Sequence, residues 1–185
     1  MRCLIQITVA LMLVGATAAS AQTTRWSFKT IVDPITDARR GIAAIESQEV
    51  MTRGMSASEA LNTAGSNIHS NARYMLVVKC DFEARGVYVS LASPRGMSRG
   101  ESSVTQRFDA GIPTTKIWSN SGTSVSLFSP DDVLTFVAGA MQATRIALRI
   151  RDADGGGPAD TVTFTGAGAA RAISQVYQAC GQSLP

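Results

Sequence analysis

Two cysteines, Cys80 and Cys180, constrain the fold of this chain more than any other feature of its sequence. They lie 100 positions apart, and the third cysteine, Cys3, stands in an N-terminal segment that we expect to be removed. Two remaining cysteines allow a single pairing, and an exported chain meets an oxidising compartment in which a disulfide is the default. Neither cysteine lies in a C-x-x-C motif, and the single histidine, His69, is near neither in sequence. We therefore predict a structural Cys80–Cys180 bridge rather than a redox pair or a metal site.

The N-terminal segment has the three parts of a secretory signal peptide. Arg2 supplies the positive start, residues 4–14 are almost unbroken apolar, and Ala-Ser-Ala at 19–21 matches an A-x-A cleavage signal. The apolar run is too short to span a bilayer, and no cysteine follows the cleavage site to carry a lipid. We predict that residues 1–21 are a cleaved signal peptide, which leaves the periplasmic product without a stable membrane anchor. A retained N-terminal anchor is the alternative.

The size and charge of the mature chain define its class only broadly. Removing 21 of the 185 residues leaves 164, which suits one domain over residues 22–185. The net charge of +3 falls to +2 when Arg2 leaves. A balance so close to neutral gives no argument for a nucleic-acid partner or a membrane surface.

Alternation of apolar and polar residues predicts a sheet-rich fold. Asp33-Pro34 ends the first strand, and Asn120-Ser121-Gly122 is a turn signal between two short strands. The strand at 72–80 and the strand at 85–93 form an expected hairpin. Strands are expected within residues 26–33, 39–47, 72–80, 85–93, 102–111, 115–120, 122–129, 144–152 and 161–166.

Two helices are expected late in the chain. After Ser129 and Pro130, apolar residues recur at helical spacing through residue 141. A second helix over residues 168–180 is followed by Gly181, which suits the position after a helix end. The fold class predicted is α+β, with a mainly antiparallel β-sheet, two late helices and one disulfide.

Most catalytic and cofactor templates lack parts in this sequence. The stretch TFTGAGAARA has Arg171 where a dinucleotide fingerprint needs Gly or Ala, so a tight strand-to-helix turn is favoured. Asp152, Asp154 and Asp160 do not follow the spacing of an EF-hand, which favours a solvated loop over a calcium site. No G-x-S-x-G motif is present. We predict no catalytic residue, no metal and no cofactor, although an enzyme that uses a carboxylate pair alone stays open.

Two groups of residues are candidates for binding a partner. Arg145, Arg149 and Arg151 share one face of the strand at 144–152 and form a basic surface that suits an anionic partner. The alternative is the solvated side of an edge strand whose charges prevent aggregation. Arg107, Asp109 and Trp118 form the second group. An exposed Trp beside Arg indicates a binding surface, whereas a Trp buried beside an Arg–Asp pair is a structural feature.

The order of motifs resembles the VasI-type family of exported proteins associated with type VI secretion. The resemblance runs from Trp26 and DPITD at 33–37, through LVVKC at 76–80, VTQRFD at 104–109 and IWSNS at 117–121, to TVTFTG and AISQVYQAC. It implies a periplasmic accessory protein without established catalytic residues. A lipid-anchor cysteine is absent here, and the RDADGGGPADT stretch and the loop at 51–71 depart from the family pattern.

We therefore expect a non-enzymatic periplasmic accessory protein, associated with type VI secretion, that binds a protein of the envelope or of the secretion machinery. The alternative is a small cell-envelope enzyme or a module that binds glycan or peptide.

Overall fold

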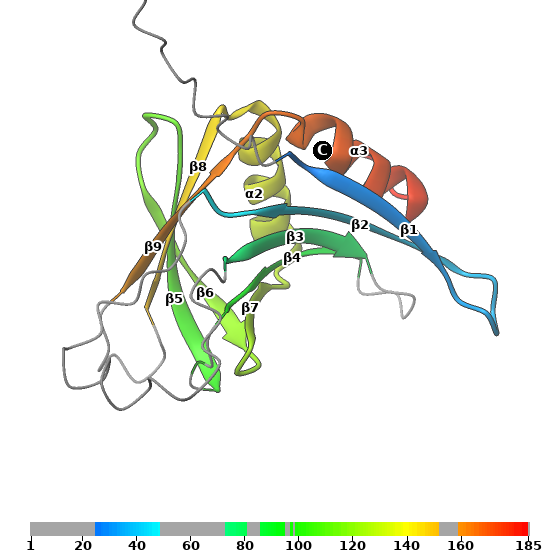
Figure 1. Cartoon of the computed structure of the whole chain (residues 1–185), viewed down its shortest axis with the longest axis horizontal. Coiled ribbons are helices and arrows are strands. Elements are labelled where there is room, and N and C mark those ends of the chain that lie inside the picture. Colours follow the sequence, from blue (N-terminus) through cyan, green and yellow to red (C-terminus); the bar gives the residue numbers. More distant parts are fainter. Residues whose placement is uncertain are drawn as a thin grey trace, which may run out of the picture.

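The computed structural model describes residues 25–48, 73–80, 86–94, 97, 99–151 and 159–184. These residues form an antiparallel sheet of nine strands and two helices, so the predicted fold class is confirmed (Figure 1). The strands are β1 Ser27–Val32, β2 Arg39–Glu46, β3 Met75–Cys80, β4 Val87–Ala92, β5 Gly100–Phe108, β6 Thr114–Asn120, β7 Ser124–Leu127, β8 Arg145–Arg151 and β9 Asp160–Thr165. The helices are α2 Pro130–Gln142 and α3 Ala169–Ala179.

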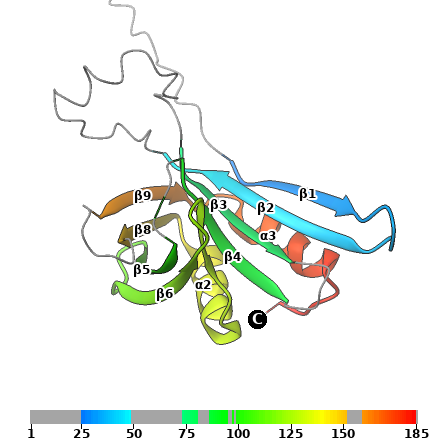
Figure 2. The same ribbon diagram turned by 90° about the horizontal axis from the view of Figure 1, so that it is seen from below.

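The order of strands across the sheet differs from their order in the chain. It runs β1-β2-β3-β4-β7-β6-β5-β8-β9, and every neighbouring pair is antiparallel. The edge of β9 opposite β8 accepts hydrogen bonds from the start and the end of the β1–β2 hairpin. Trp26 donates its indole N–H to the carbonyl of Thr165 at 3.0 Å, and the backbone N–H of Gln48 donates to Thr163 at 2.8 Å. The sheet is therefore strongly curved, as Figures 1 and 2 show.

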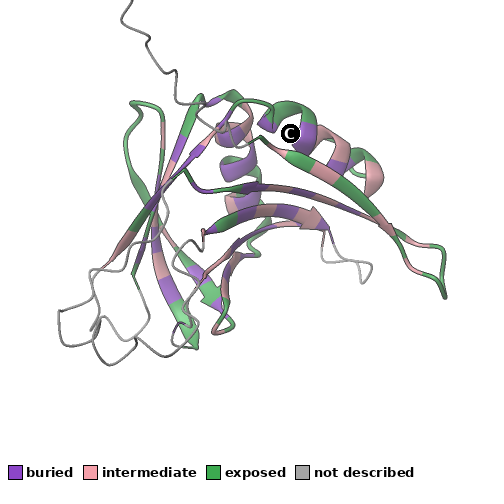
Figure 3. Ribbon diagram, viewed as in Figure 1, coloured by how far each residue is buried: buried purple, intermediate pink, exposed green. Residues whose placement is uncertain are grey.

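Both helices cover one face of the sheet, which we call the inner face. Helix α2 places Phe136 between two rings of the sheet, with its centroid 5.4 Å from that of Phe108 and 5.8 Å from that of Trp118. Both pairs meet edge to face, the arrangement that ring quadrupoles favour. Phe136 and Trp118 are fully buried. Buried and exposed residues alternate along the strands, which leaves the opposite, outer face to solvent (Figure 3).

The predicted Cys80–Cys180 disulfide is present. Cys80 is the last residue of β3, Cys180 is the residue that ends α3, and their Cα atoms lie 6.2 Å apart. Helix α3 packs on β1, β2 and β3. Gly181 follows with a φ of 64°, the left-handed conformation that glycine adopts without steric cost and that was expected there. The bridge therefore fixes the end of α3 to the end of β3, the third strand in the order of the sheet.

The glycine-rich stretch before α3 is a tight turn, as its sequence predicts. A Cβ atom on Gly166 would lie 1.7 Å from the carbonyl oxygen of Ala143, the residue that follows α2. No side chain fits in that space, because real Cβ contacts are never so short. Glycine at this position therefore allows β9 and α3 to pass directly against the end of α2.

Candidate functional site

Four arginines point outward from two neighbouring strands and form what we call the arginine face. Arg107 lies near the end of β5, and Arg145, Arg149 and Arg151 lie on β8; all four are exposed. Strand periodicity places the three residues of β8 on one side, because alternate residues share a face. Their apolar neighbours on β8 point into the core. The structure thus brings together residues that the sequence placed in two separate candidate groups.

A groove of about 520 Å³ runs along this face, beside the turn that follows β5. Residues of three strands contribute to its lining, which includes Thr105, Arg107, Arg145, Ala147, Arg149 and Thr161. Arg151 continues the same face of β8 beyond the groove. The groove combines guanidinium and hydroxyl groups with apolar side chains, among them Pro113 and Ala147.

The arginines of β8 do not protect an edge strand. Strand β8 is paired with β5 along one side and with β9 along the other. Its backbone groups are therefore engaged in the sheet, and the edge-strand alternative is wrong. Charges that block edge-to-edge aggregation are needed only where a row of backbone groups is unpaired.

The register spaces the four positive charges without placing any two directly opposite. The facing pairs are Ser103 with Arg151, Thr105 with Arg149, and Arg107 with Ala147. Like charges directly opposite on neighbouring strands destabilise a sheet, and each arginine here faces a small or neutral side chain. On the other side of β8, Arg149 donates from Nε to Thr161 Oγ1 at 3.3 Å. Among the described residues, no carboxylate forms an ion pair with an arginine of this face.

Asp109 holds the fold together at one end of the groove and does not pair with Arg107. Its Oδ1 accepts hydrogen bonds from the hydroxyl of Thr144 at 2.6 Å, from the backbone N–H of Thr144 at 3.0 Å and from that of Arg145 at 2.9 Å. The hydrogen bond from the Thr144 hydroxyl and the bond from the Arg145 N–H lower the pKa of the Asp109 carboxyl. Asp109 therefore joins the end of β5 to the start of β8 and positions Arg145, while it also lines the groove; its assignment as a partner-binding residue stays a prediction.

Trp118 is not part of the exposed surface. It is fully buried on the inner face of β6, against Phe136. The arginine face lies on the other side of the sheet, so Trp118 cannot contact a partner that binds there. The structural alternative considered from the sequence is correct for this residue, while the Arg–Asp pair that accompanied it is not formed.

Among the described carboxyl groups, those of Asp33, Asp109 and Asp132 have pKa values lowered from the ordinary range. Asp33 accepts a hydrogen bond from the backbone N–H of Ile35, which lowers its pKa. Asp132 has its pKa lowered by the hydrogen bond from Lys116, whose Nζ lies 2.7 Å from Oδ1. A glycosidase general acid needs the opposite shift, because it must hold its proton near neutral pH.

Within the described parts of the chain, no group of His, Cys, Asp or Glu side chains could hold a metal ion. His69, Asp152 and Asp154, which the sequence analysis discussed, lie outside the described residues. Across those same parts, the structure has no helix with the length and apolar character that a membrane crossing requires.

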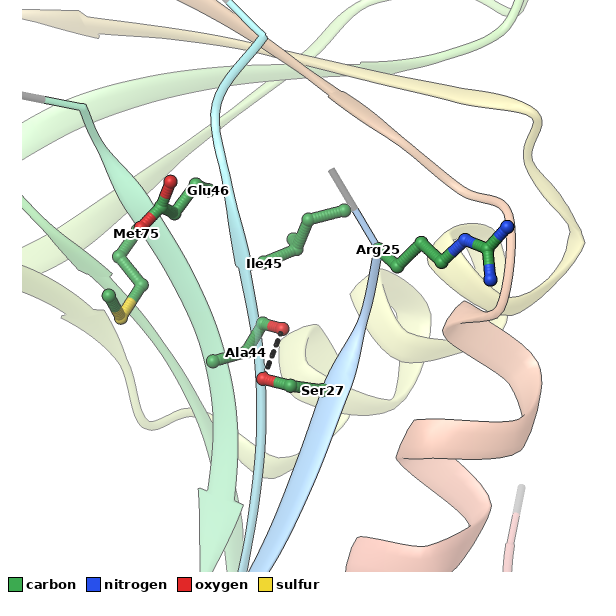
Figure 4. Close-up of a pocket in the computed structure, with 6 residues that line it drawn as sticks. All are labelled: Arg25, Ser27, Ala44, Ile45, Glu46 and Met75. Carbon is green, nitrogen blue, oxygen red and sulfur yellow. Dashed lines mark hydrogen bonds between the residues drawn. The ribbon is translucent and has the colours of Figure 1, made fainter. Parts of the chain in front are cut away.

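Two further hollows lie near the start of β1. The smaller, about 300 Å³, is lined by Arg25, Ser27, Glu46 and Met75, among others (Figure 4). Ser27 donates to the carbonyl of Ala44 at 3.2 Å, and the Arg25 side chain extends away from Glu46. The second, about 620 Å³, lies between Trp26 and the start of α3. Neither gathers charged groups as the arginine face does.

Comparison with known proteins gives little further information. No family model matches this chain, and no curated protein matches its sequence. A similar solved structure is the crystal structure of invasion associated protein B from Bartonella henselae, with 15% sequence identity and a TM-score of 0.49. The match covers 84% of this chain and 96% of that chain. Similarity at this level carries no argument about function.

The patterns in the sequence did not indicate that Ala147, Thr105 and Thr161 line the groove. Each is an ordinary strand residue, and no local pattern distinguishes it. Their importance comes from the pairing of β5, β8 and β9, which joins segments that are far apart in the chain.

Proposed function

We propose that this chain is an exported, non-enzymatic accessory protein of the periplasm that binds an acidic segment of an envelope protein through the arginine face. The observation that carries the proposal is the set of four exposed arginines on paired, interior β8 and neighbouring β5. Four positive charges in one place repel one another, and protection of a strand edge does not explain them, because β8 is paired on both sides. Binding an anionic partner would relieve that repulsion and would steer association.

Export is supported by two independent features. The first 21 residues have the pattern of a signal peptide, and the Cys80–Cys180 disulfide suits an oxidising compartment. The association with type VI secretion depends on the resemblance to the VasI-type family. That resemblance favours a protein of the secretion machinery as the partner.

The test uses pull-down from an envelope extract of the source organism, with bound proteins identified by mass spectrometry. Arg145→Ser/Arg149→Ser/Arg151→Ser should lose a partner that the parent retains. The thermal transition should move little, since exposed substitutions usually change stability by less than about 0.5 kcal/mol. The matched control is Lys29→Ser/Arg39→Ser/Arg171→Ser, which removes the same charge from exposed positions on other elements.

Equal retention of partners by parent and triple arginine variant would contradict the proposal. So would loss in both the variant and the control, because net charge alone would then explain binding. The enzyme alternative predicts turnover of cell-wall fragments by the purified parent that is lost when a carboxylate is replaced.

A further inference from the structure

The arginine face has a regular spacing that indicates the form of its partner. Strand β8 has four outward positions, and arginine occupies three of them, Arg145, Arg149 and Arg151. The remaining position holds Ala147, and directly opposite it on β5 lies Arg107. Arg107 therefore supplies from the neighbouring strand the positive charge that β8 lacks.

Along the axis of β8, the order of charges is Arg145, Arg107, Arg149 and Arg151. Outward residues of one strand are about 6.6 Å apart, and facing residues on neighbouring strands are about 5 Å apart. The backbone positions that carry the arginines thus recur at about 6.6 Å along the strand direction, with that of Arg107 displaced sideways by one strand. Arginine side chains are long enough to bring the displaced group into line.

Among the described residues, most side chains around this row are neutral. Two described carboxylates lie near the row: Asp109 lines the groove at one end, and Glu101 lies on β5 two residues before Ser103, which faces Arg151. Asp109 is engaged by Thr144 and Arg145. Threonines flank the row on both sides, with Thr105 and Thr115 on one and Thr161 on the other.

We infer that the partner contributes an extended segment with a carboxylate at every second residue, lying along β8. This inference depends on the proposed function, since it specifies the acidic segment bound there. Alternate side chains of an extended chain repeat at about 6.6–6.8 Å, which matches the spacing of the arginines. An extended segment also has free backbone groups that the flanking threonine hydroxyls can bond, whereas a helix has paired its own.

Two peptides of identical composition test this inference on the disulfide-bonded mature protein. They are fluorescein-labelled Glu-Ser-Glu-Ser-Glu-Ser-Glu and Ser-Glu-Glu-Glu-Glu-Ser-Ser, and their binding is measured by fluorescence anisotropy at low salt. Peptides this short do not form stable helices, and glutamates two residues apart cannot share a helix face. The alternating peptide presents four carboxylates to the arginine face and the block peptide presents two, so the alternating peptide should bind about tenfold more tightly.

A rescue experiment separates spacing from total charge. Arg107→Ser should weaken binding of the alternating peptide by about threefold. Adding Ala147→Arg to that variant returns a guanidinium to the same level of the row, from β8 itself, and should restore binding to within about twofold of the parent. A purely structural role of Arg107 would not be rescued in this way. The thermal transition of each variant shows whether it is folded.

The outcomes distinguish this inference from the proposed function. Equal binding of the two peptides would contradict the inferred spacing of the carboxylates, but not the proposal that the partner is acidic. If neither peptide binds the parent, the proposal that the arginine face binds an acidic segment is wrong. If oligothymidylate displaces the alternating peptide and binds more tightly to the same arginines, the occupant is a nucleic acid and the inference fails. Should a variant not fold, the two peptides on the parent protein still decide the question.

Discussion

Replacing both cysteines of the Cys80–Cys180 bridge with alanine should lower the free energy of unfolding by a few kcal/mol. The bridge closes a loop with a sequence separation of 100 residues. In the chain-entropy account, a loop of this length restricts the unfolded chain by about 4.7 kcal/mol, and measured bridges commonly give about 2–4 kcal/mol. Because domains of this size are stable by only about 5–15 kcal/mol, the loss is a large fraction of the total.

The structure indicates which other terms enter this loss. Cys80 is 4% exposed at the end of β3, so Cys80→Ala also removes a buried sulfur atom from the core. The parent protein with its bridge reduced keeps both sulfur atoms and lacks only the covalent link. Comparing the oxidised parent, the reduced parent and Cys80→Ala/Cys180→Ala therefore separates loop closure from packing.

Urea unfolding followed by circular dichroism provides the assay. The two forms without the bridge should unfold at lower urea concentration and with a steeper dependence on urea, because their unfolded states are less compact and expose more surface. Thiol titration of the denatured, unreduced mature parent should find no free thiol. A double variant within about 0.5 kcal/mol of the oxidised parent would refute the reasoning, and two free thiols would show that the bridge does not form.

Four further predictions follow from single features of the chain. Gly166→Ala should strongly lower the melting temperature because its Cβ would overlap the Ala143 carbonyl, whereas Gly181→Ala, with open space around it, should cost on the order of 1 kcal/mol of left-handed strain. Phe136→Ala should destabilise by about 3–5 kcal/mol in urea unfolding, since it removes contacts with Phe108 and Trp118; a loss below about 1 kcal/mol would contradict this packing. The lowered pKa of Asp109 means that its contribution to stability is full above the ordinary pKa of 3.8 and is lost as pH falls through the folded-state pKa. Melting temperature should therefore fall less on acidification in Asp109→Asn than in the parent, with Glu101→Gln as the exposed control. Mass spectrometry of the exported product should find Gln22 at its N-terminus, and a full-length membrane-bound species would contradict cleavage.

Local patterns in the sequence determined the secondary structure and one face of the candidate site. Alternation placed Arg145, Arg149 and Arg151 on the outward side of a strand, because the direction of a side chain depends only on its position along that strand. The Cys80–Cys180 pairing followed from the number of cysteines left after the predicted signal peptide. Pro130 and Gly181 marked the start and the end of the two helices correctly, since their backbone preferences are local.

The tertiary structure alone decided which strands are neighbours, and the properties of the site depend on that. Pairing of β8 with both β5 and β9 excluded an edge strand, placed Arg107 opposite Ala147 and gave Asp109 the backbone of residues 144–145 as its partner. Trp118 is buried because β6 turns that side toward α2. The pairing of β5 with β8 joins residues 38 to 48 positions apart in the chain, and this choice of partners depends on how the whole sheet buries its apolar face under α2 and α3. A local pattern of residues determines the face on which a side chain lies, whereas its neighbours on that face are set by the packing of the entire chain.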